Sequence, residues 1–338
     1  RELPKFFGSI NANPMFLGLD LKGGVHFLLQ VDKDNIYKNL LRENEADIKK
    51  LLIKERIRFS LPKRNDKNFS IILNNNDDYT RALELIENAN NNGDYDVITE
   101  KQNLLVKLAP SEKAIDYDVK SSVTKNMTIL RNRVNELGVS QPIVQREGKN
   151  RIIVQLPGLQ DSTRAKNILG STATLEFRLT KGTIDDWNAS LSSGGSTLSD
   201  GLLYKHRNGS PVLLSRDVIA SGKDIEGANS GFDGQTNQPA VFVNLSSYGA
   251  SRMLETTSKN VGNRMAVVFV EQDKSQVINV ATIREAFSKR FQITGIDIVE
   301  SKDLAILLRS GSLSAPMSII EERTVGPDLG QDSIDAGI

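Results

Sequence analysis

LGLDLKGGVHFLLQVD, residues Leu17–Asp32, contains the strand on which the rest of this chain is built. From Val25 onward the residues alternate as in a strand, and both faces are largely apolar, which is typical of a strand in the middle of a sheet. Gly23-Gly24 stands directly before that strand. Because glycine tolerates positive φ and lets another backbone approach closely, we expect the chain to bend or to be crossed here.

The segments after this strand alternate between helical and extended patterns. Lys33–Arg58 has the spacing of an amphipathic helix, and Asp77-Asp78 opens a second helix after two short strands. Further strands extend to Leu104–Leu108. Counted from Val25, the order strand, helix, strand, strand, helix, strand predicts a ferredoxin-like unit.

A second such pattern follows. Its long helix is predicted to start at Pro110 and Ser111 and to stop at Gly138, since apolar residues recur every three or four positions at Ile115, Val119, Val123, Met127, Leu130, Val134 and Leu137. A hairpin and a helix capped by Asp161 come next, and Ala173–Leu179 is predicted as the last strand of the unit. The sequence leaves open which strand completes which sheet.

The character of the chain changes at Gly182. Gly182–Ser210 is rich in Ser and Gly and predicts a loop excursion, whereas strand and helix patterns resume from Pro211 and continue to Ile296. We therefore predict an α+β fold, with one or two ferredoxin-like βαββαβ units and a further α+β region after them.

The composition excludes several classes of partner and site. Forty-three basic and 42 acidic side chains leave a net charge of +1, which argues against nucleic acid as a partner. The chain has no cysteine, so disulfides and thiolate metal sites are excluded. No apolar run reaches the roughly 18 to 20 residues that cross a bilayer.

Residue types that carry chemistry are sparse or unfavourably spaced. His26 and His206 lie far apart without partners at ligand spacing, and we interpret them as a sheet residue and a loop residue. The segment FDGQTNQ around Asp233 lacks the acids of a calcium loop and predicts a turn. Neither a phosphate-binding glycine motif nor GxSxG occurs. We therefore predict no catalytic, metal or cofactor-binding residue, no cofactor, and no enzyme.

Four stretches, in this order, resemble the SecD family of bacterial membrane proteins, which work with SecF beside the Sec protein-translocation channel. They are the stretch quoted first and three others: Met127–Gly158, Ala173–Leu179 and Leu307–Gly330. The family motif positions that match are Asp20, Gly23, Gly24, Arg131, Arg133, Gly138, Gly326 and Pro327. We interpret these residues as structural.

The resemblance implies a division into segments. Residues 1–16 form a lead-in, 17–181 a base in which 33–110 is an insertion, 182–298 the inserted head, and 299–338 a return to the base and an approach to the next transmembrane helix. Family members carry a transmembrane helix before this region and several after it. We therefore expect residues 1–338 to be a fragment, the periplasmic portion of a multi-pass protein of the bacterial inner membrane.

The resemblance also implies a function. SecD and SecF use the proton-motive force to assist the translocation of preproteins, and their large periplasmic domain contacts the emerging polypeptide and moves its head relative to its base. The expected partners are SecF, the SecYEG channel with its accessory subunits, unfolded preprotein, and the membrane through helices absent from this chain. Three glycines near the predicted boundaries are hinge candidates: Gly182, Gly295 and Gly311.

An unfolded polypeptide offers backbone groups and scattered apolar side chains, so Phe242, Met253 and Met265 in the head are candidates for contacting it. The alternative at each position is packing of the head's own core. Two other functions remain open: a structural domain that only docks on the translocon, and the porter domain of an efflux pump of the RND superfamily. One Trp and 6% aromatic residues give little support to the aromatic pocket that a porter needs.

Overall fold

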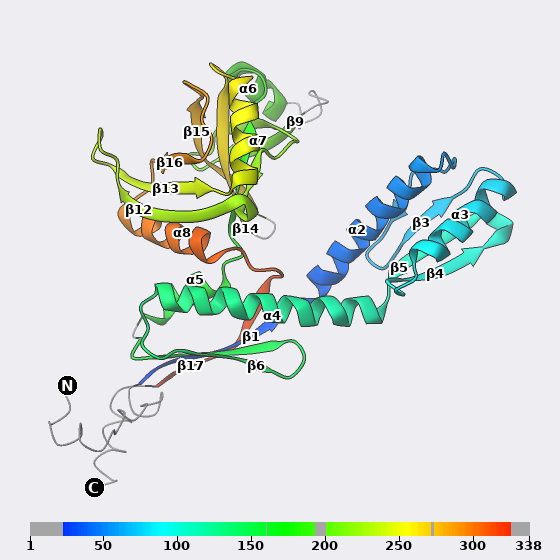
Figure 1. Cartoon of the computed structure of the whole chain (residues 1–338), viewed down its shortest axis with the longest axis horizontal. Helices are drawn as coiled ribbons and strands as arrows, with labels where there is room; N and C mark the ends of the chain where they lie inside the picture. Colours follow the sequence, from blue (N-terminus) through cyan, green and yellow to red (C-terminus); the bar gives the residue numbers. More distant parts are fainter. Residues whose placement is uncertain (1–22, 160, 193–200, 272–273, 326–338) are drawn as a thin grey trace, which may run out of the picture.

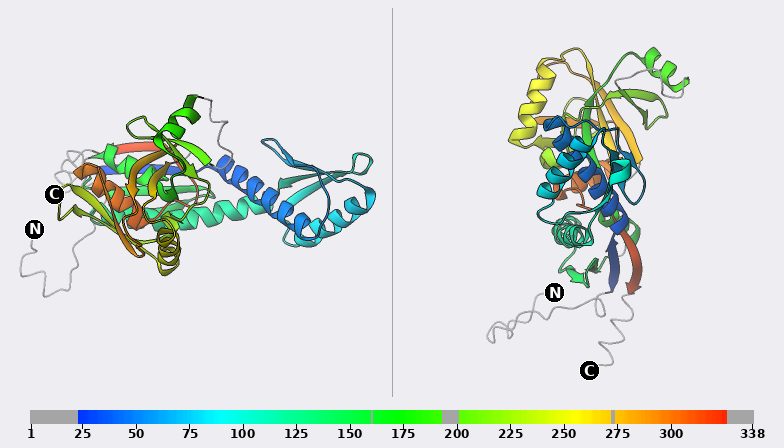
Figure 2. Two further views of the ribbon diagram at one scale, coloured as in Figure 1. Left: turned by 90° about the horizontal axis from the view of Figure 1, so that it is seen from above. Right: turned by 90° about the vertical axis from the view of Figure 1, so that its right-hand side faces the viewer.

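The computed structural model describes residues 23–159, 161–192, 201–271 and 274–325. Within them helices and strands are mixed and the strands fall into four sheets, which confirms the α+β prediction. Figure 1 shows three bodies, which we call the base, the insert and the head, and Figure 2 shows the insert projecting away from the other two.

The base is a four-stranded antiparallel sheet, ordered β17-β1-β7-β6, with two helices packed on one face. Its elements are β1 (Gly24–Val31), α4 (Glu112–Glu136), β6 (Ile143–Glu147), β7 (Arg151–Pro157), α5 (Ser162–Gly170) and β17 (Met317–Val325). β1 lies between β17 and β7, so the central position predicted for it is confirmed. Gly23, directly before β1, and Gly24, its first residue, both have positive φ, 64° and 134° respectively. The Gly23 carbonyl accepts a hydrogen bond from the Gly158 amide.

The long helix α4 begins and ends where its sequence predicts. The Ser111 hydroxyl caps it by accepting the Ala114 amide, and Gly138 follows its end with φ 72°. The predicted apolar stripe packs on the base sheet, where Val123, Leu130 and Val134 are fully buried. This helix therefore carries the base core and spans the distance to the insert (Figure 1).

The insert has its own sheet, ordered β2-β3-β5-β4, and its own hydrophobic core. Its elements are α2 (Lys33–Lys54), β2 (Lys63–Arg64), β3 (Phe69–Ile72), α3 (Asn76–Ala89), β4 (Tyr95–Glu100), η2 (Lys101–Asn103) and β5 (Leu105–Pro110). β1 is not part of this sheet, so the prediction that it opens the first unit is wrong. The apolar residues of β1 pack against α4 instead.

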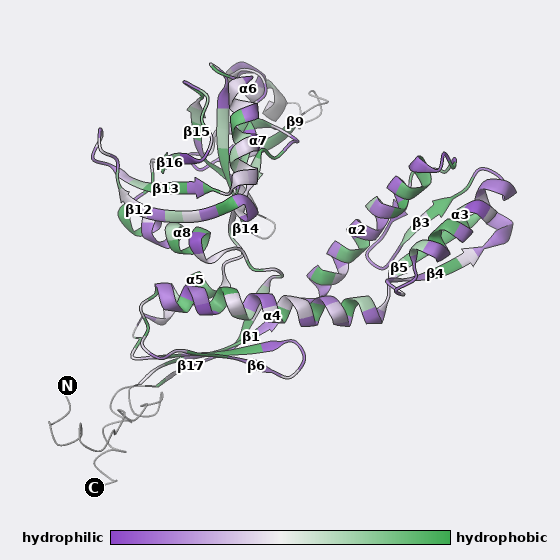
Figure 3. Cartoon of the chain, in the orientation of Figure 1, coloured by the Kyte–Doolittle hydropathy of each residue, from purple (hydrophilic) through white to green (hydrophobic). Residues whose placement is uncertain are grey.

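The head combines a six-stranded sheet, ordered β10-β9-β15-β14-β8-β11, with a three-stranded sheet, ordered β12-β13-β16. Its strands are β8 (Thr174–Leu179), β9 (Gly201–His206), β10 (Pro211–Ser215), β11 (Ala220–Ser221), β12 (Ile225–Phe232), β13 (Pro239–Leu245), β14 (Arg264–Glu271), β15 (Lys274–Thr282) and β16 (Arg290–Thr294). Its helices are α6 (Ile184–Ser192), η3 (Gly222–Asp224), α7 (Ser247–Ser258) and α8 (Ile298–Ser310). In Figure 3 helix α8 carries both hydrophobic (green) and hydrophilic (purple) residues.

Two predictions about this region are wrong. β8 does not close a base unit: it pairs with β14 and β11, and its Leu175 and Phe177 are fully buried in the head core. The place beside β1 is taken by β17. The stretch 182–210 is not only a loop, since it contains α6 and β9, and Trp187 of α6 packs on Val212 and Leu214. The boundaries of the head at 182 and 298 stay predictions.

Candidate functional site

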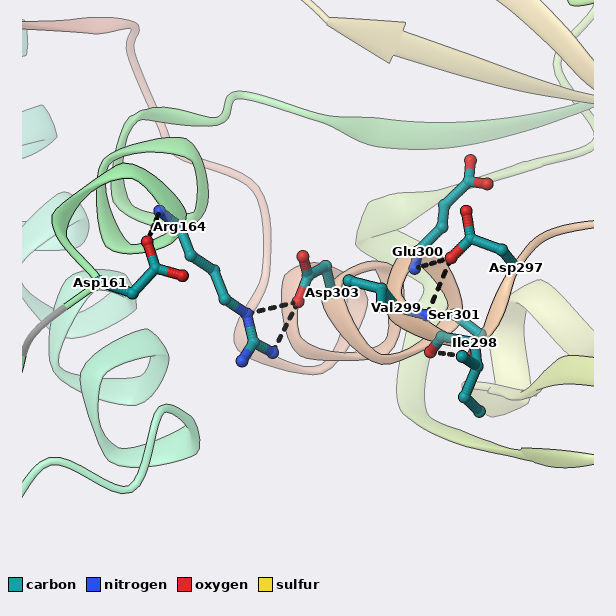
Figure 4. Close-up of polar contacts among 8 residues, drawn as sticks. All are labelled: Asp161, Arg164, Asp297, Ile298, Val299, Glu300, Ser301 and Asp303. Carbon is teal, nitrogen blue, oxygen red and sulfur yellow. Dashed lines mark hydrogen bonds and ion pairs between the residues drawn. The ribbon is translucent and has the colours of Figure 1, made fainter.

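Helix α8 connects the head to the base. Its Leu304, Ala305 and Leu308 are buried in the head core, whereas Ile306 and Leu307 pack with Ile168 and Ala173 of the α5 region. Asp297 caps its start: one carboxylate oxygen accepts the amides of Val299 and Glu300, each at 2.8 Å (Figure 4). The two sides of α8 therefore pack on different neighbours, the head core and the α5 region.

A cleft of about 470 Å³ opens beside this helix. The apolar part of its lining comes from β14, β15 and α8: Phe269, Ile278, Val299, Leu304 and Leu307. Polar and charged groups form the rest of the wall: Arg207, Gln276, Asp297, Glu300 and Asp303. An open cleft with an apolar floor and a charged rim suits a segment of extended polypeptide better than a small polar metabolite.

Two ion pairs border the cleft, and only one of them joins the head to the base. Arg207 donates to Glu300 at 2.6 Å and to the Gly295 carbonyl at 3.3 Å, within the head. Arg164 of α5 donates to Asp303 of α8 at 2.8 Å (Figure 4). Both pairs are partly exposed, so each contributes about 0 to 1 kcal/mol.

A second junction lies behind α8, around a buried arginine. Arg133 of α4 is 0% exposed, and its Nη1 donates to the carbonyls of Ile168, Leu169 and Ser171 at 2.6, 3.1 and 2.7 Å. Its Nη2 donates to the Gly311 carbonyl at 3.1 Å. Desolvation lowers the pKa of Arg133 to about 10, with Glu271 acting in the opposite direction.

The predicted polypeptide-contacting residues divide between core and surface. Met253 is 0% exposed and Met265 is buried, and both pack in the head core, which was the alternative left open for them. Phe242 is 38% exposed on β13, and the absence of a side chain at Gly231 leaves room for its ring. Of the three, only Phe242 offers a side chain to a partner in this conformation.

The hinge candidates lie in different places. Gly182 follows β8 and Gly295 follows β16, so both lie within the head, with φ of 65° and 80°. Gly311, with φ 90°, ends α8 where the chain returns toward the base. The three glycines do not lie together, and of the three only Gly311 lies on a connection between the head and the base.

The motif residue Arg131 makes a contact within the base. Arg131 donates to the Val144 carbonyl at 3.1 Å and so joins α4 to β6. Asp20, Gly326 and Pro327 lie outside the described residues. Sequence reasoning missed Asn126, which is 0% exposed on the base-facing side of α4; a polar residue within an apolar stripe was the available signal.

The two histidines are apart, as expected from their spacing. His26 lies in β1 beside Gln155, 3.3 Å from its side-chain nitrogen, and His206 Nδ1 lies 3.3 Å from the Asn208 amide. Asp233 forms a turn: its carboxylate accepts from the amide and the hydroxyl of Thr236, from the Gln292 side chain and from the Gln235 amide. These bonds lower its pKa to about 2. Within the described ranges, no group of three or more His, Cys, Asp or Glu side chains could hold a metal ion.

Three family models match the chain. They are described as "SecD/SecF GG Motif", over residues 8–34; "Protein translocase subunit SecDF, P1 domain, N-terminal", over 123–182; and "SecDF, P1 head subdomain", over 200–315. Together they cover more than half of the chain. Among the helices that the structure describes, none combines the length and the hydropathy needed to cross a membrane.

Curated relatives match along almost the whole chain. The protein translocase subunit SecD of Pseudomonas aeruginosa is 39% identical over 99% of this chain, and that of Escherichia coli K12 is 37% identical over 99%. The chain spans 56% of the length of each of these two proteins. A crystal structure of SecDF in a super-membrane-facing form matches with a TM-score of 0.52 and 26% identity, over 98% of this chain and 34% of that chain. The chain therefore belongs to the SecD family of protein translocase subunits and covers the P1 region of that family.

Proposed function

We propose that this chain is the periplasmic part of a SecD subunit of the bacterial inner membrane, and that it contacts unfolded polypeptide that emerges from the Sec channel. In this proposal SecF and SecYEG with its accessory subunits are the partners, and the proton-motive force acts through membrane helices of the whole protein. The head changes orientation on the base as polypeptide is bound and released. No chemical step is assigned to these residues.

The observation that carries the proposal is the cleft beside α8. Every unfolded chain has apolar side chains, so a receptor that accepts many sequences needs an apolar floor of adaptable shape rather than a specific polar constellation. Phe269, Ile278 and Leu307 supply that floor. The charged side chains at the rim keep the empty cleft hydrated. Because α8 forms one wall, a bound segment presses on the element that joins head and base.

Photo-crosslinking tests the contact. A benzophenone side chain is placed at Gln276, an exposed position in the cleft wall, in a complete SecD protein assembled with its translocase and a stalled preprotein. The control position is Tyr117, which is exposed on α4. We expect at least tenfold more preprotein adduct from position 276 than from position 117. Equal yields, or adducts with channel subunits alone, would reject the contact and favour a purely docking role.

A reversible lock tests the movement. Residues 1–338 contain no cysteine, so Arg164→Cys with Asp303→Cys gives a single pair in this region, across the Arg164–Asp303 ion pair. In a complete protein cleared of any other cysteine, a short bismethanethiosulfonate reagent joins the two. The matched control is Glu226→Cys with Lys289→Cys, across an ion pair that lies within the head and does not line the cleft. We expect only the base–head lock to abolish assisted export, and reduction to restore it. Normal export with the base–head lock closed would exclude the movement.

A further inference from the structure

The chain passes between base and head at two connections, and both lie against α4. The first, Ser171–Ala173, joins α5 to β8, and the second, 311–316, joins α8 to β17. The Ser312 hydroxyl donates to the Ala173 carbonyl at 3.4 Å, so the two connections also touch each other. Any rotation of the head on the base must change backbone angles in these two segments.

Two buried polar side chains of α4 hold these connections. Arg133 donates to Ser171 in the first connection and to Gly311 at the start of the second. Asn126, seven residues earlier on the same side of the helix, accepts the Ser314 amide at 2.7 Å and donates to the Ala315 carbonyl at 2.9 Å. The two side chains thus form hydrogen bonds with the second connection near both of its ends.

The charge on Arg133 is balanced in an unusual way. Among the described residues its hydrogen-bond acceptors are all backbone carbonyls, from the C-terminal end of α5 and from Gly311 at the C-terminal end of α8. The C-terminal end of a helix carries partial negative charge and stabilises a cation there. Glu271 at the end of β14 accepts from the Ser171 hydroxyl at 2.8 Å and adds a favourable charge nearby.

This arrangement links the solvation of a buried cation to the position of the head. Arg133 Nε already lacks a hydrogen-bond partner within the described residues. If α8 moves away with the head, Arg133 also loses Gly311 and the partial charge of that helix end, and a buried cation with fewer acceptors is costly. The orientation in which both helix ends converge on Arg133 is therefore favoured.

We propose that Arg133 and Asn126 form a clasp on α4 that holds the head in this orientation, and that head movement requires the clasp to open at Gly311–Ala315. The proposal rests on the head movement proposed above and names the residues that restrain it. Gly311 then acts as the flexible point, since its φ of 90° is readily accessible only to glycine. Gly182 and Gly295 stay with the head when it moves.

Distance measurements between base and head test the clasp. Lys120→Cys on α4 and Ser251→Cys on α7 are exposed positions, and in this cysteine-free chain a spin-label pair attaches only there. The distance distribution is measured by pulsed electron paramagnetic resonance on the purified 338-residue chain. The clasp variants are Arg133→Lys and Asn126→Ala. Their controls, Arg131→Lys and Asn132→Ala, make the same changes at exposed positions of α4.

We expect both clasp variants to raise the fraction of molecules outside the main distance peak at least tenfold, and the controls to leave it unchanged. A residue that only contributes stability would lower the melting temperature without changing the distances in folded molecules. In Asn126→Ala we also expect faster hydrogen exchange of the Ser314 amide, since its acceptor is removed. If Arg133→Lys does not fold, Asn126→Ala alone is decisive.

An unchanged distance distribution in a folded clasp variant would overturn the proposal. That result is separate from the crosslinking and locking experiments on the complete protein. The clasp proposal can thus be rejected while the proposed polypeptide contact and head movement are kept. In that case another restraint would set the orientation of the head.

Discussion

Arg164 of α5 donates from both Nε and Nη2 to a single oxygen of Asp303 in α8, at 3.1 and 2.8 Å (Figure 4). The arginine belongs to the base and the aspartate to the head. The Arg164 amide itself donates to Asp161, the residue that caps α5. The ion pair therefore ties the first turn of one helix to the middle of another, across the junction that the proposed movement has to change.

The energy of this ion pair is predicted to be small. Both side chains are partly exposed, so a double-mutant cycle with Arg164→Gln and Asp303→Asn should give a coupling of about 0.2 to 1 kcal/mol, decreasing with added salt. Urea unfolding of the four proteins measures it. A coupling above about 2 kcal/mol would show that the pair is a rigid restraint and that head movement has to break it at high cost.

A substitution at Val299 tests polypeptide contact at the cleft without disturbing the head core. Its side chain is 59% exposed at the mouth, so Val299→Asp should change the free energy of unfolding by no more than about 0.5 kcal/mol. The introduced carboxylate should disfavour apolar segments and reduce the preprotein adduct from position 276 several-fold. Val261→Asp, at an exposed apolar position that does not line the cleft, is the control and should leave the adduct unchanged. Equal yields in the two variants would remove the cleft from the proposed contact.

Alanine substitutions at Met253 and Phe242 should differ in their effects on stability and on polypeptide crosslinking. Met253 is fully buried, so Met253→Ala should lower the free energy of unfolding by about 2 to 5 kcal/mol through lost packing and the cavity left behind. Phe242→Ala removes a partly exposed ring and should cost less than Met253→Ala, while reducing polypeptide crosslinking to the β12–β13 surface. Chemical denaturation and crosslinking on both variants separate the two roles. If Met253→Ala left the free energy of unfolding nearly unchanged but impaired crosslinking, Met253 would be a polypeptide-binding residue after all.

Asp233 should make stability depend on acid pH. Hydrogen bonds from Thr236, Gln292 and Gln235 lower its folded pKa from 3.8 to about 2, so its contribution is fully present above about pH 4 and is lost as pH falls toward 2. Asp233→Asn should therefore flatten the pH dependence of the free energy of unfolding in that interval. The control, Asp66→Asn, changes the charge equally at an exposed turn. Identical slopes for Asp233→Asn and the unsubstituted chain would show that these hydrogen bonds do not hold the carboxylate ionised.

Local sequence was sufficient for the elements whose signals are local. The apolar faces of β1 identified it as a central strand, and the three-to-four spacing together with Ser111 and Gly138 placed α4 correctly. The cap at Asp161 and the glycine pair at the start of β1 could be predicted for the same reason, because each depends on a few neighbouring residues. Two of the four stretches that carry the family resemblance include β1 and the end of α4, and the other two include β8 and the segment from α8 to β17.

The partners of those elements were settled by packing between distant residues. β8 and β17 have similar strand patterns, yet β17, about 300 residues after β1, pairs with it, while β8 enters the head. The same holds for Arg133 and Asn126: their residue types are visible in the sequence, but their acceptors come from α5 and from the segment after α8. Periodicity reports which face of an element is buried. It does not report what covers that face, because that depends on competition among distant segments for the same apolar surface.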